Sequence, residues 1–252
     1  MKKLIIAATF GMFVGLSALS SFGVNAAGPS VPVDKAHNDL SDKESLKKGF
    51  KTYINYCLGC HQLQYQRYNR TFTDLGIEEA DGVANYMYTG DKVGGHILNS
   101  MPKKDAASWF GSAPPDLTLE ARLRSPDWIY TYLRSFYIDE SRPFGVNNTV
   151  FKDVGMPHVL QDLQGVSNLV VSKELDEQGE EHEVSHLSPA MGGSLTAEEY
   201  DVVVRDLTNF LEYVGEPNKL ERKALGYWVL AFLFFFFILA YFLKKEYWKD
   251  IH

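Results

Sequence analysis

Two cysteines and a histidine carry the most distinctive chemistry of this 252-residue chain. The run Cys57-Leu58-Gly59-Cys60-His61 contains both cysteines of the sequence. Cys-x-x-Cys-His is the attachment motif of c-type haem, in which the thiols add to the haem vinyl groups and the histidine ligates the iron. A thioredoxin-like dithiol would not explain the adjoining His61, and a zinc site would need further thiols or clustered histidines. We therefore expect one covalent haem c on Cys57, Cys60 and His61.

The second axial ligand has several candidates. An electron-transfer haem of this type usually has methionine or histidine opposite the first histidine. Met191 precedes the last helix of the body, where a simple class I cytochrome c places its ligand. Met156 lies between a glycine that permits close backbone approach and a proline that stiffens the segment, and His158 follows closely. Local chemistry leaves Met156 and Met191 open, with core packing as the ordinary role of either.

The N-terminus has the pattern of an export signal. Lys2 and Lys3 precede an apolar stretch at 4–19, and small residues at 24–26 form a cleavage site. We expect residues 1–26 to be a signal peptide. The body would then lie on the periplasmic side of a bacterial inner membrane.

The C-terminus has the pattern of a membrane anchor. Residues 225–243 contain no charged residue and include four consecutive phenylalanines. At about 1.5 Å per residue this stretch reaches the ~30 Å hydrocarbon core. We expect one transmembrane helix at 225–243 in contact with membrane lipid. Lys244 and Lys245 open a short cytoplasmic tail, residues 244–252, in keeping with positive charge on the inner side.

Residues 27–220 are enough for one domain with a hydrophobic core. The formal charge is −7, and it becomes −9 when Lys2 and Lys3 leave with the signal peptide. This balance excludes nucleic acid as a partner and favours a basic protein. Acidic residues crowd 174–183, a stretch that forms either a solvated loop or an electrostatic docking surface.

The body is expected to be mainly helical with long loops. Ser41 or Asp42 caps a helix that runs to about residue 56 and ends in the cysteine motif. A capping box at 196–199 opens a second helix that ends near residue 214. Gly49 would allow the two helices to approach closely. This is the arrangement of a class I cytochrome c fold, and residues 71–188 between them have few strand-like runs, of which 168–171 is the best.

The haem motif and the landmarks after it resemble the cytochrome c1 family, the c-haem subunits of ubiquinol–cytochrome c reductase. The match covers essentially the whole chain after the signal peptide. It rests on the following segments in the family order: Lys48-Gly49-Phe50, Tyr53, Tyr56 to His61, Tyr65, Tyr68, Ala113-Pro114-Pro115-Asp116-Leu117, Arg122, Arg124, Tyr130, Gly155-Met156-Pro157 and the C-terminal anchor.

The resemblance implies roles for individual residues. It makes Met156 the axial ligand opposite His61, against the class I placement at Met191. It also implies that the carbonyl of Pro115 accepts a hydrogen bond from the His61 ring, which orients a metal ligand. The remaining residues implied to contact the haem are Arg124, a propionate partner, with Arg122 and Tyr130.

The implied function is electron transfer within a reductase complex. Electrons would arrive from a Rieske iron–sulfur protein and leave to a cytochrome c acceptor, while a cytochrome b subunit performs the quinone chemistry. The family's complex is a dimer. The chain departs from the family at 108–111, after Pro157 and in the acidic stretch. Two alternatives are a free membrane-anchored cytochrome c that feeds an oxidase, and a haem sensor or enzyme with an open iron position.

Overall fold

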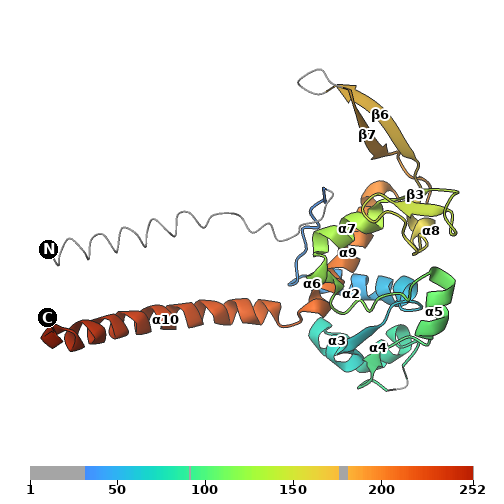
Figure 1. Ribbon diagram of the computed structural model, residues 1–252. Helices are drawn as coiled ribbons and strands as arrows, with labels where there is room; N and C mark the ends of the chain where they lie inside the picture. The colour runs from blue at the N-terminus through green and yellow to red at the C-terminus, as the bar shows by residue number, and fades with distance from the viewer. Residues whose placement is uncertain (1–31, 91, 176–180, 252) are drawn as a thin grey trace. The chain divides into compact units, whose positions relative to one another are not determined.

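The computed structural model describes residues 32–90, 92–175 and 181–251. The expected signal peptide, residues 1–26, lies outside the described residues. The helices of the described part are α2 (Lys43–Thr52), α3 (Tyr68–Leu75), α4 (Glu79–Tyr86), α5 (Lys103–Phe110), α6 (Glu120–Leu123), α7 (Pro126–Arg134), α8 (Gln161–Gln164), α9 (Ala197–Gly215) and α10 (Lys219–Tyr247). A π-helical turn, η1, spans Tyr53–Cys57, and a 3-10 turn, η2, spans Lys249–Ile251. Figure 1 shows the arrangement.

The helix before the cysteine motif begins where the sequence predicts. The Asp42 carboxylate accepts hydrogen bonds from the backbone N–H groups of Glu44 and Ser45. Such a cap satisfies donors that a helix N-terminus otherwise leaves without partners. The α-helix ends at Thr52, earlier than predicted, because the chain widens into the π turn η1 that delivers Cys57. Single π turns of this kind are frequent at functional sites.

Helix α9 crosses α2 at the centre of the core. Its first turn has the predicted capping box, in which Thr196 and Glu199 bond reciprocally. A side-chain Cβ at Gly49 of α2 would overlap the backbone carbonyl of Asp206 in α9. The predicted close approach is therefore confirmed, because only glycine lacks that atom.

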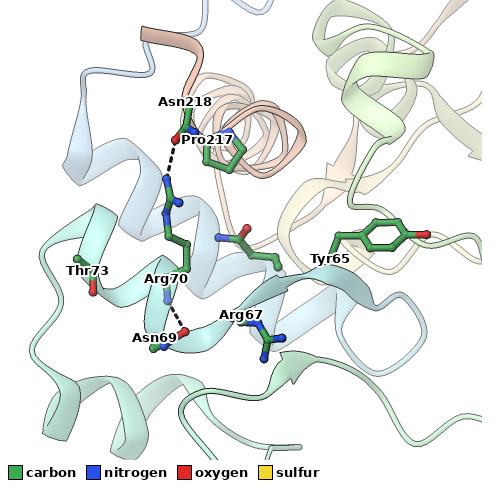
Figure 2. A pocket seen from close by; sticks show the side chains of 8 residues that line it. Tyr65, Arg67, Asn69, Arg70, Thr73, Pro217 and Asn218 are labelled. Carbon is green, nitrogen blue, oxygen red and sulfur yellow. Dashed lines mark hydrogen bonds between the residues drawn. The ribbon is translucent and has the colours of Figure 1, made fainter. Parts of the chain in front are cut away.

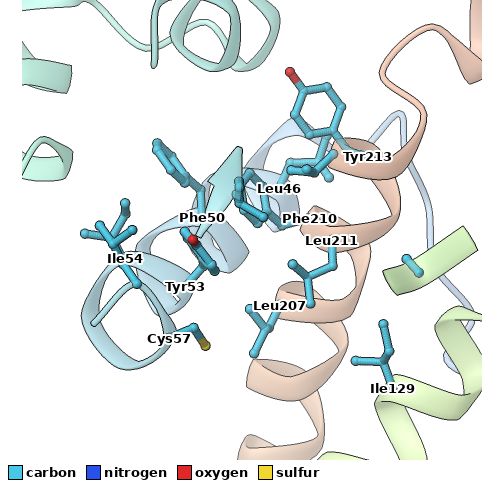
Figure 3. Close-up of a cluster of buried hydrophobic side chains, with 14 of the residues drawn as sticks. Leu46, Phe50, Tyr53, Ile54, Cys57, Ile129, Leu207, Phe210, Leu211 and Tyr213 are labelled. Carbon is cyan, nitrogen blue, oxygen red and sulfur yellow. The ribbon is translucent and has the colours of Figure 1, made fainter. Parts of the chain in front are cut away.

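Aromatic side chains fill the space around this crossing. Phe50 and Phe210 are fully buried with ring centroids 5.0 Å apart, and Phe50 also stacks on Tyr86 at 4.9 Å. Figure 3 shows Phe50 of α2 and Tyr53 of η1 beside Phe210 of α9, with Cys57 at the end of η1. Tilted and offset ring pairs add to the stabilisation from apolar burial alone. This cluster fixes the end of the helix that presents the cysteines.

Helix α7 packs on the other side of α9. Tyr200 donates to the backbone carbonyl of Leu133 at 2.8 Å. Arg134 donates to both carboxylate oxygens of Asp201, at 2.6 and 3.1 Å. The two-bond geometry fixes orientation as well as contact. Helices α2, α7 and α9 therefore form one frame, and the expected mainly helical body, with the last helix packed across the helix before the cysteine motif, is confirmed.

In the part of the chain that the structure describes, the strands form four antiparallel pairs. They are β1 (Leu63–Arg67) with β2 (His96–Ile97), β3 (Phe136–Ile138) with β4 (Val146–Asn148), β5 (Gly165–Val166) with β8 (Met191–Gly192), and β6 (Leu169–Leu175) with β7 (Glu181–Leu187). The predicted short strand at 168–171 is the beginning of β6. The described residues of 71–188 also form five short helices, α4 to α8, that the sequence patterns did not reveal.

The acidic stretch is described only at its two ends, and residues 176–180 lie outside the described residues. Leu169 pairs with Leu187 and Lys173 with Glu183, so that acidic positions lie within a regular hairpin. β-branched and aliphatic residues in both strands favour an extended backbone. Among the described elements, each strand of this hairpin packs mainly against the other strand.

Helix α10 contains the predicted membrane span. It is long and apolar enough to cross a bilayer, and the side chains of its apolar window are exposed. A soluble domain would bury such a surface. Two ion pairs join its first turn to the end of α9, Lys219 with Glu212 at 2.5 Å and Arg222 with Glu216 at 2.5 Å.

Candidate haem site

A cavity of about 410 Å³ opens beside the cysteine motif. Its walls come from the end of η1, the loop at 113–117, helix α7, the loop at 154–157 and helix α9. Most of the lining side chains are aliphatic or aromatic, and the polar groups are few. A largely apolar, preformed cavity with a few convergent polar groups is typical of a cofactor site.

Cys57, Cys60 and His61 all line this cavity on one side. The backbone N–H groups of Cys60 and His61 both donate to the carbonyl of Cys57, at 3.1 and 2.8 Å. Tyr53 donates its buried hydroxyl to the carbonyl of His61 at 2.6 Å. The motif is therefore a compact turn that places two sulfurs and one imidazole along the same wall.

The thiols lack the electrostatics of a redox dithiol. Burial raises the pKa of Cys57 to about 12 and also raises the pKa of Cys60. Thiol–disulfide enzymes depend on a lowered cysteine pKa. In the described part of the chain, no group of three metal-ligating side chains is gathered that could hold a zinc ion. Covalent attachment of a haem remains the chemistry that fits both thiols and the histidine.

The ring of His61 is held through its Nδ1 atom. This nitrogen lies 2.8 Å from the carbonyl oxygen of Pro115. Because a carbonyl only accepts, Nδ1 carries the proton and Nε2 keeps its lone pair. Burial lowers the pKa of His61, although the bond to Pro115 partly opposes the effect. A buried neutral imidazole with a free Nε2 is the form that ligates a metal.

The proline loop is tied to the segment after the motif. Leu117 N–H donates to the carbonyl of Gln62 at 3.0 Å, and the Asp116 carboxylate accepts from the N–H of Gln64 at 2.8 Å. These bonds fix the position of the Pro115 carbonyl independently of any bound ligand. The orientation of His61 is therefore built into the chain.

Met156 lies on another wall of the same cavity. A Cβ on Gly155 would lie 2.7 Å from the carbonyl oxygen of Phe110, so the loop passes close to another backbone at that point. Just before it, Asp153 has a positive φ of 62°. Its N–H donates to the side-chain oxygen of Asn147 at 2.9 Å, and its carbonyl accepts from Arg142 at 2.7 Å. These contacts hold the strained turn that presents the methionine.

The other candidate ligands lie elsewhere. Met191 belongs to strand β8, is 75% exposed and is absent from the cavity lining. The ring of His158 stacks on Phe136 at 4.7 Å and is not part of the lining either. Burial lowers the pKa of His158 to about 4. The structure therefore brings His61 and Met156 to one cavity and leaves the alternatives outside.

Of the residues that the resemblance implies to contact the haem, some line the cavity and others lie outside it. Arg124 lines the cavity, with its guanidinium 4.5 Å above the Trp128 ring and an ion pair to Glu120 at 3.1 Å. Arg122 lies outside the cavity, beside Gly215 of α9. Tyr130 is also outside, with the Arg134 guanidinium 4.6 Å from its ring. Pro115 is the fourth implied residue, and its carbonyl reaches His61 as described.

Sequence reasoning missed three aromatic residues of the cavity, Trp128, Tyr132 and Phe151. Trp128 and Tyr132 are four residues apart, which places both on one face of α7, and the Arg124 guanidinium lies over the Trp128 ring. This spacing was readable in the sequence. Burial raises the pKa of Tyr132, so its hydroxyl keeps its proton and acts as a donor.

A second cavity of about 620 Å³ lies between β1, α3 and the start of α10. Figure 2 shows Arg70 spanning it to reach Asn218, with 2.7 Å between the guanidinium and the amide oxygen. Tyr65 and Arg67 complete its polar rim. It contains neither cysteine nor either predicted iron ligand, so it is separate from the haem cavity.

Comparison with known proteins shows which family has a similar sequence. The sequence matches the family described as "Cytochrome C1 family" at residues 35–167 and 193–251. A protein of Allochromatium vinosum named "Cytochrome c1" is 50% identical over the full length of both chains. A "Cytochrome c1" of Rhodospirillum rubrum is 25% identical over 83% of each chain.

Another relative has a different name. A protein of Nitrosomonas europaea named "Ammonia monooxygenase gamma subunit" is 45% identical over 93% of this chain and 95% of its own length. The matched residues of the family pattern omit 168–192, the segment that contains the β6–β7 hairpin.

Proposed function

The chain belongs to the cytochrome c1 family, and from this premise we propose how its residues serve the family's electron transfer. As a member it is an electron-transfer subunit of ubiquinol–cytochrome c reductase, it carries one covalent haem c, and it is anchored in a membrane. Electrons pass from the Rieske iron–sulfur protein through this subunit to a cytochrome c acceptor. The observation that supports it best is one apolar cavity bordered by both thiols, His61 and Met156.

Cys57 and Cys60 would bind the haem covalently, and His61 and Met156 would be its axial ligands. When bound, the haem supplies one-electron chemistry at iron, at a higher potential with histidine and methionine than with two histidines. The bond from His61 to Pro115 orients the imidazole, and the Asn147 and Arg142 contacts orient the methionine loop. If His61 and Met156 both ligate the iron, these side chains would leave no position on it for oxygen.

Arg124 would hold a haem propionate. Its side chain is 39% exposed and lines the cavity, so a guanidinium is available at the rim of an otherwise apolar site. Guanidinium pairs with carboxylate through two parallel hydrogen bonds. Arg122 and Tyr130 would not touch the haem, because neither side chain lines the cavity. Arg122 packs beside α9, and the ring of Tyr130 contacts Arg134.

We assign the chain to the inner membrane of a bacterium with its haem domain in the periplasm. Residues 1–26 would be a cleaved signal peptide and 27–220 the haem domain. Residues 225–243 would span the membrane and 244–252 would be a cytoplasmic tail. The support is the basic and apolar N-terminal pattern and the lysines that follow the span.

The partners would be a cytochrome b subunit, the Rieske protein and a cytochrome c acceptor, within a dimeric complex. Mild-detergent purification through a C-terminal tag tests the assignment. We expect b-type haem and a Rieske centre to copurify with c-type haem, and the preparation to oxidise ubiquinol. If c-type haem alone appears under the gentlest extraction, the chain is instead a free membrane-anchored carrier.

The name of the Nitrosomonas relative raises an oxygenase as a second candidate. Oxygen chemistry at a haem requires an open axial position. In this chain Met156 shares the cavity with His61, which would close that position. Slow carbon monoxide binding by the ferrous protein supports electron transfer, whereas fast binding in the native state would support an open iron.

A further inference from the structure

The hydroxyl of Tyr132 points at the sulfur of Met156. The Oη and Sδ atoms lie 3.3 Å apart, in hydrogen-bond geometry with the hydroxyl as donor. Both side chains line the haem cavity. Within the described residues, this sulfur is the only hydrogen-bond partner of the hydroxyl. A buried tyrosine hydroxyl normally has a partner, and here a weak thioether acceptor fills that role.

The ring of Tyr132 is fixed by neighbours other than the methionine. It stacks on Trp128 with centroids 5.0 Å apart and planes at 9°, and it meets Phe136 edge-on at 5.2 Å. Its backbone belongs to α7, whose carbonyl at Tyr132 also accepts from Asn148 at 2.8 Å. The position of the hydroxyl is therefore set by the frame of the fold, and the flexible methionine adapts to it.

A thioether sulfur has two lone pairs. If one accepts the hydrogen bond from Tyr132, only the other remains for a metal. We propose that Tyr132 is a positioning residue, which selects the lone pair that Met156 presents to the haem iron and raises the reduction potential by drawing electron density from the sulfur. This inference rests on the proposed function, in which Met156 is the axial ligand.

The direction of the effect follows from charge. Ferric iron carries one more positive charge than ferrous iron and depends more on electron donation by its ligands. A hydrogen bond to the sulfur weakens that donation, so it disfavours the ferric state and raises the potential. One hydrogen bond changes an equilibrium by roughly two- to tenfold. For one electron this corresponds to about 20–60 mV.

The test compares Tyr132→Phe with Tyr200→Phe in the purified, membrane-extracted complex. Tyr132→Phe keeps the ring and removes the hydrogen-bond donor. We therefore expect the reduction potential of the c-type haem to fall by about 20–60 mV. Tyr200 is a buried tyrosine that does not line the haem cavity, and its hydroxyl donates to the backbone carbonyl of Leu133 instead of to a sulfur. Tyr200→Phe should leave the potential unchanged. An unchanged or higher potential in Tyr132→Phe would overturn the proposal and leave Tyr132 a packing residue.

A second variant covers the case in which Tyr132→Phe fails to assemble. Fluorotyrosine placed at position 132 retains the ring and makes the hydroxyl a stronger donor, so the potential should rise. No rise would overturn the proposal independently. Met156→Leu separates this inference from the proposed function: it should abolish the sulfur-to-iron charge-transfer band of the ferric protein. If the band persists in Met156→Leu, the axial assignment fails; if it is lost and the Tyr132 variants show no shift, only the present inference fails.

Discussion

The two predicted iron ligands are prepared for binding in different ways. His61 is oriented by one strong contact, the 2.8 Å bond from Nδ1 to the Pro115 carbonyl. Met156 is oriented by its loop, where Asp153 adopts a positive φ and Asn147 satisfies its N–H. A rigid ring needs only one tether, whereas a flexible thioether needs its backbone fixed.

The methionine assignment predicts a contrast between two substitutions. Met156→Leu should open the iron to rapid carbon monoxide binding and lower the reduction potential, because the sulfur ligand is lost. Met191→Leu should do neither, since Met191 is 75% exposed in β8. Carbon monoxide kinetics and a redox titration of both variants provide the measurement. The reverse pattern would restore the class I placement.

At the scale of elements, the crossing of α2 and α9 determines the position of the cysteine motif. The carbonyl of Asp206 occupies the space beside Gly49, and Phe50 packs on Phe210 immediately after it. A polar network closes the crossing: Ser45 donates to the Asp206 carboxylate at 2.6 Å, and Asn209 donates to Ser45 at 3.1 Å. Movement of either helix would displace Cys57.

Gly49→Ala should therefore destabilise the haem domain. The added methyl group overlaps the Asp206 carbonyl, and such overpacking costs roughly 1–3 kcal/mol. We expect a lower thermal midpoint and less covalently attached haem, measured by melting curves and by haem staining. Gly94→Ala is the matched control, because a Cβ there meets nothing within 4 Å. Equal stability of the two variants would contradict the close approach.

Asp206→Asn should stabilise the chain at neutral pH. Burial raises the pKa of Asp206, with the hydrogen bond from Ser45 opposing the effect. A raised carboxyl pKa in the folded state means that stability is lost as pH rises through that pKa. The variant should thus have a higher thermal midpoint than the wild type at pH values above this pKa. The difference should vanish at pH values below 3.8, the ordinary pKa of an aspartate. Thermal midpoints of the variant and the wild type, measured from below pH 3.8 to neutral pH, test this prediction.

At the scale of the whole molecule, the chain combines the haem domain with two segments of different purpose. Helix α10 exposes its apolar side chains, as a membrane anchor does. The β6–β7 hairpin lies within the part that the family pattern omits, and its strands pair mainly with each other. An isolated two-stranded hairpin is marginally stable in water. Its removal should leave the domain intact.

Replacing residues 169–187 by an Asn-Gly turn tests this independence. The flanking residues Asn168 and Ser188 already lie side by side, with the Ser188 N–H donating to the Asn168 carbonyl at 2.9 Å. We expect unchanged haem content and a thermal midpoint within error of the wild type. Failure of the shortened chain to join its complex would show instead that the hairpin has a partner there.

The sequence by itself predicted the covalent chemistry and the apolar helix near the C-terminus. Cys57, Cys60 and His61 are adjacent in sequence, so local spacing suffices to identify their role. The capping box at Thr196 and the uncharged stretch at 225–243 are likewise local signals. Each of these features depends on residues within a few helical turns of one another.

Only the tertiary structure decided which side chains share the cavity. Met156 and Met191 have similar local chemistry, and the fold places one inside the cavity and the other on the surface. It also separates Arg124 from Arg122, two residues away, and joins Tyr132 to Met156 across 24 positions. Such choices depend on contacts between segments distant in sequence, and loop conformations such as the turn at Asp153 carry no periodic signal that would reveal them.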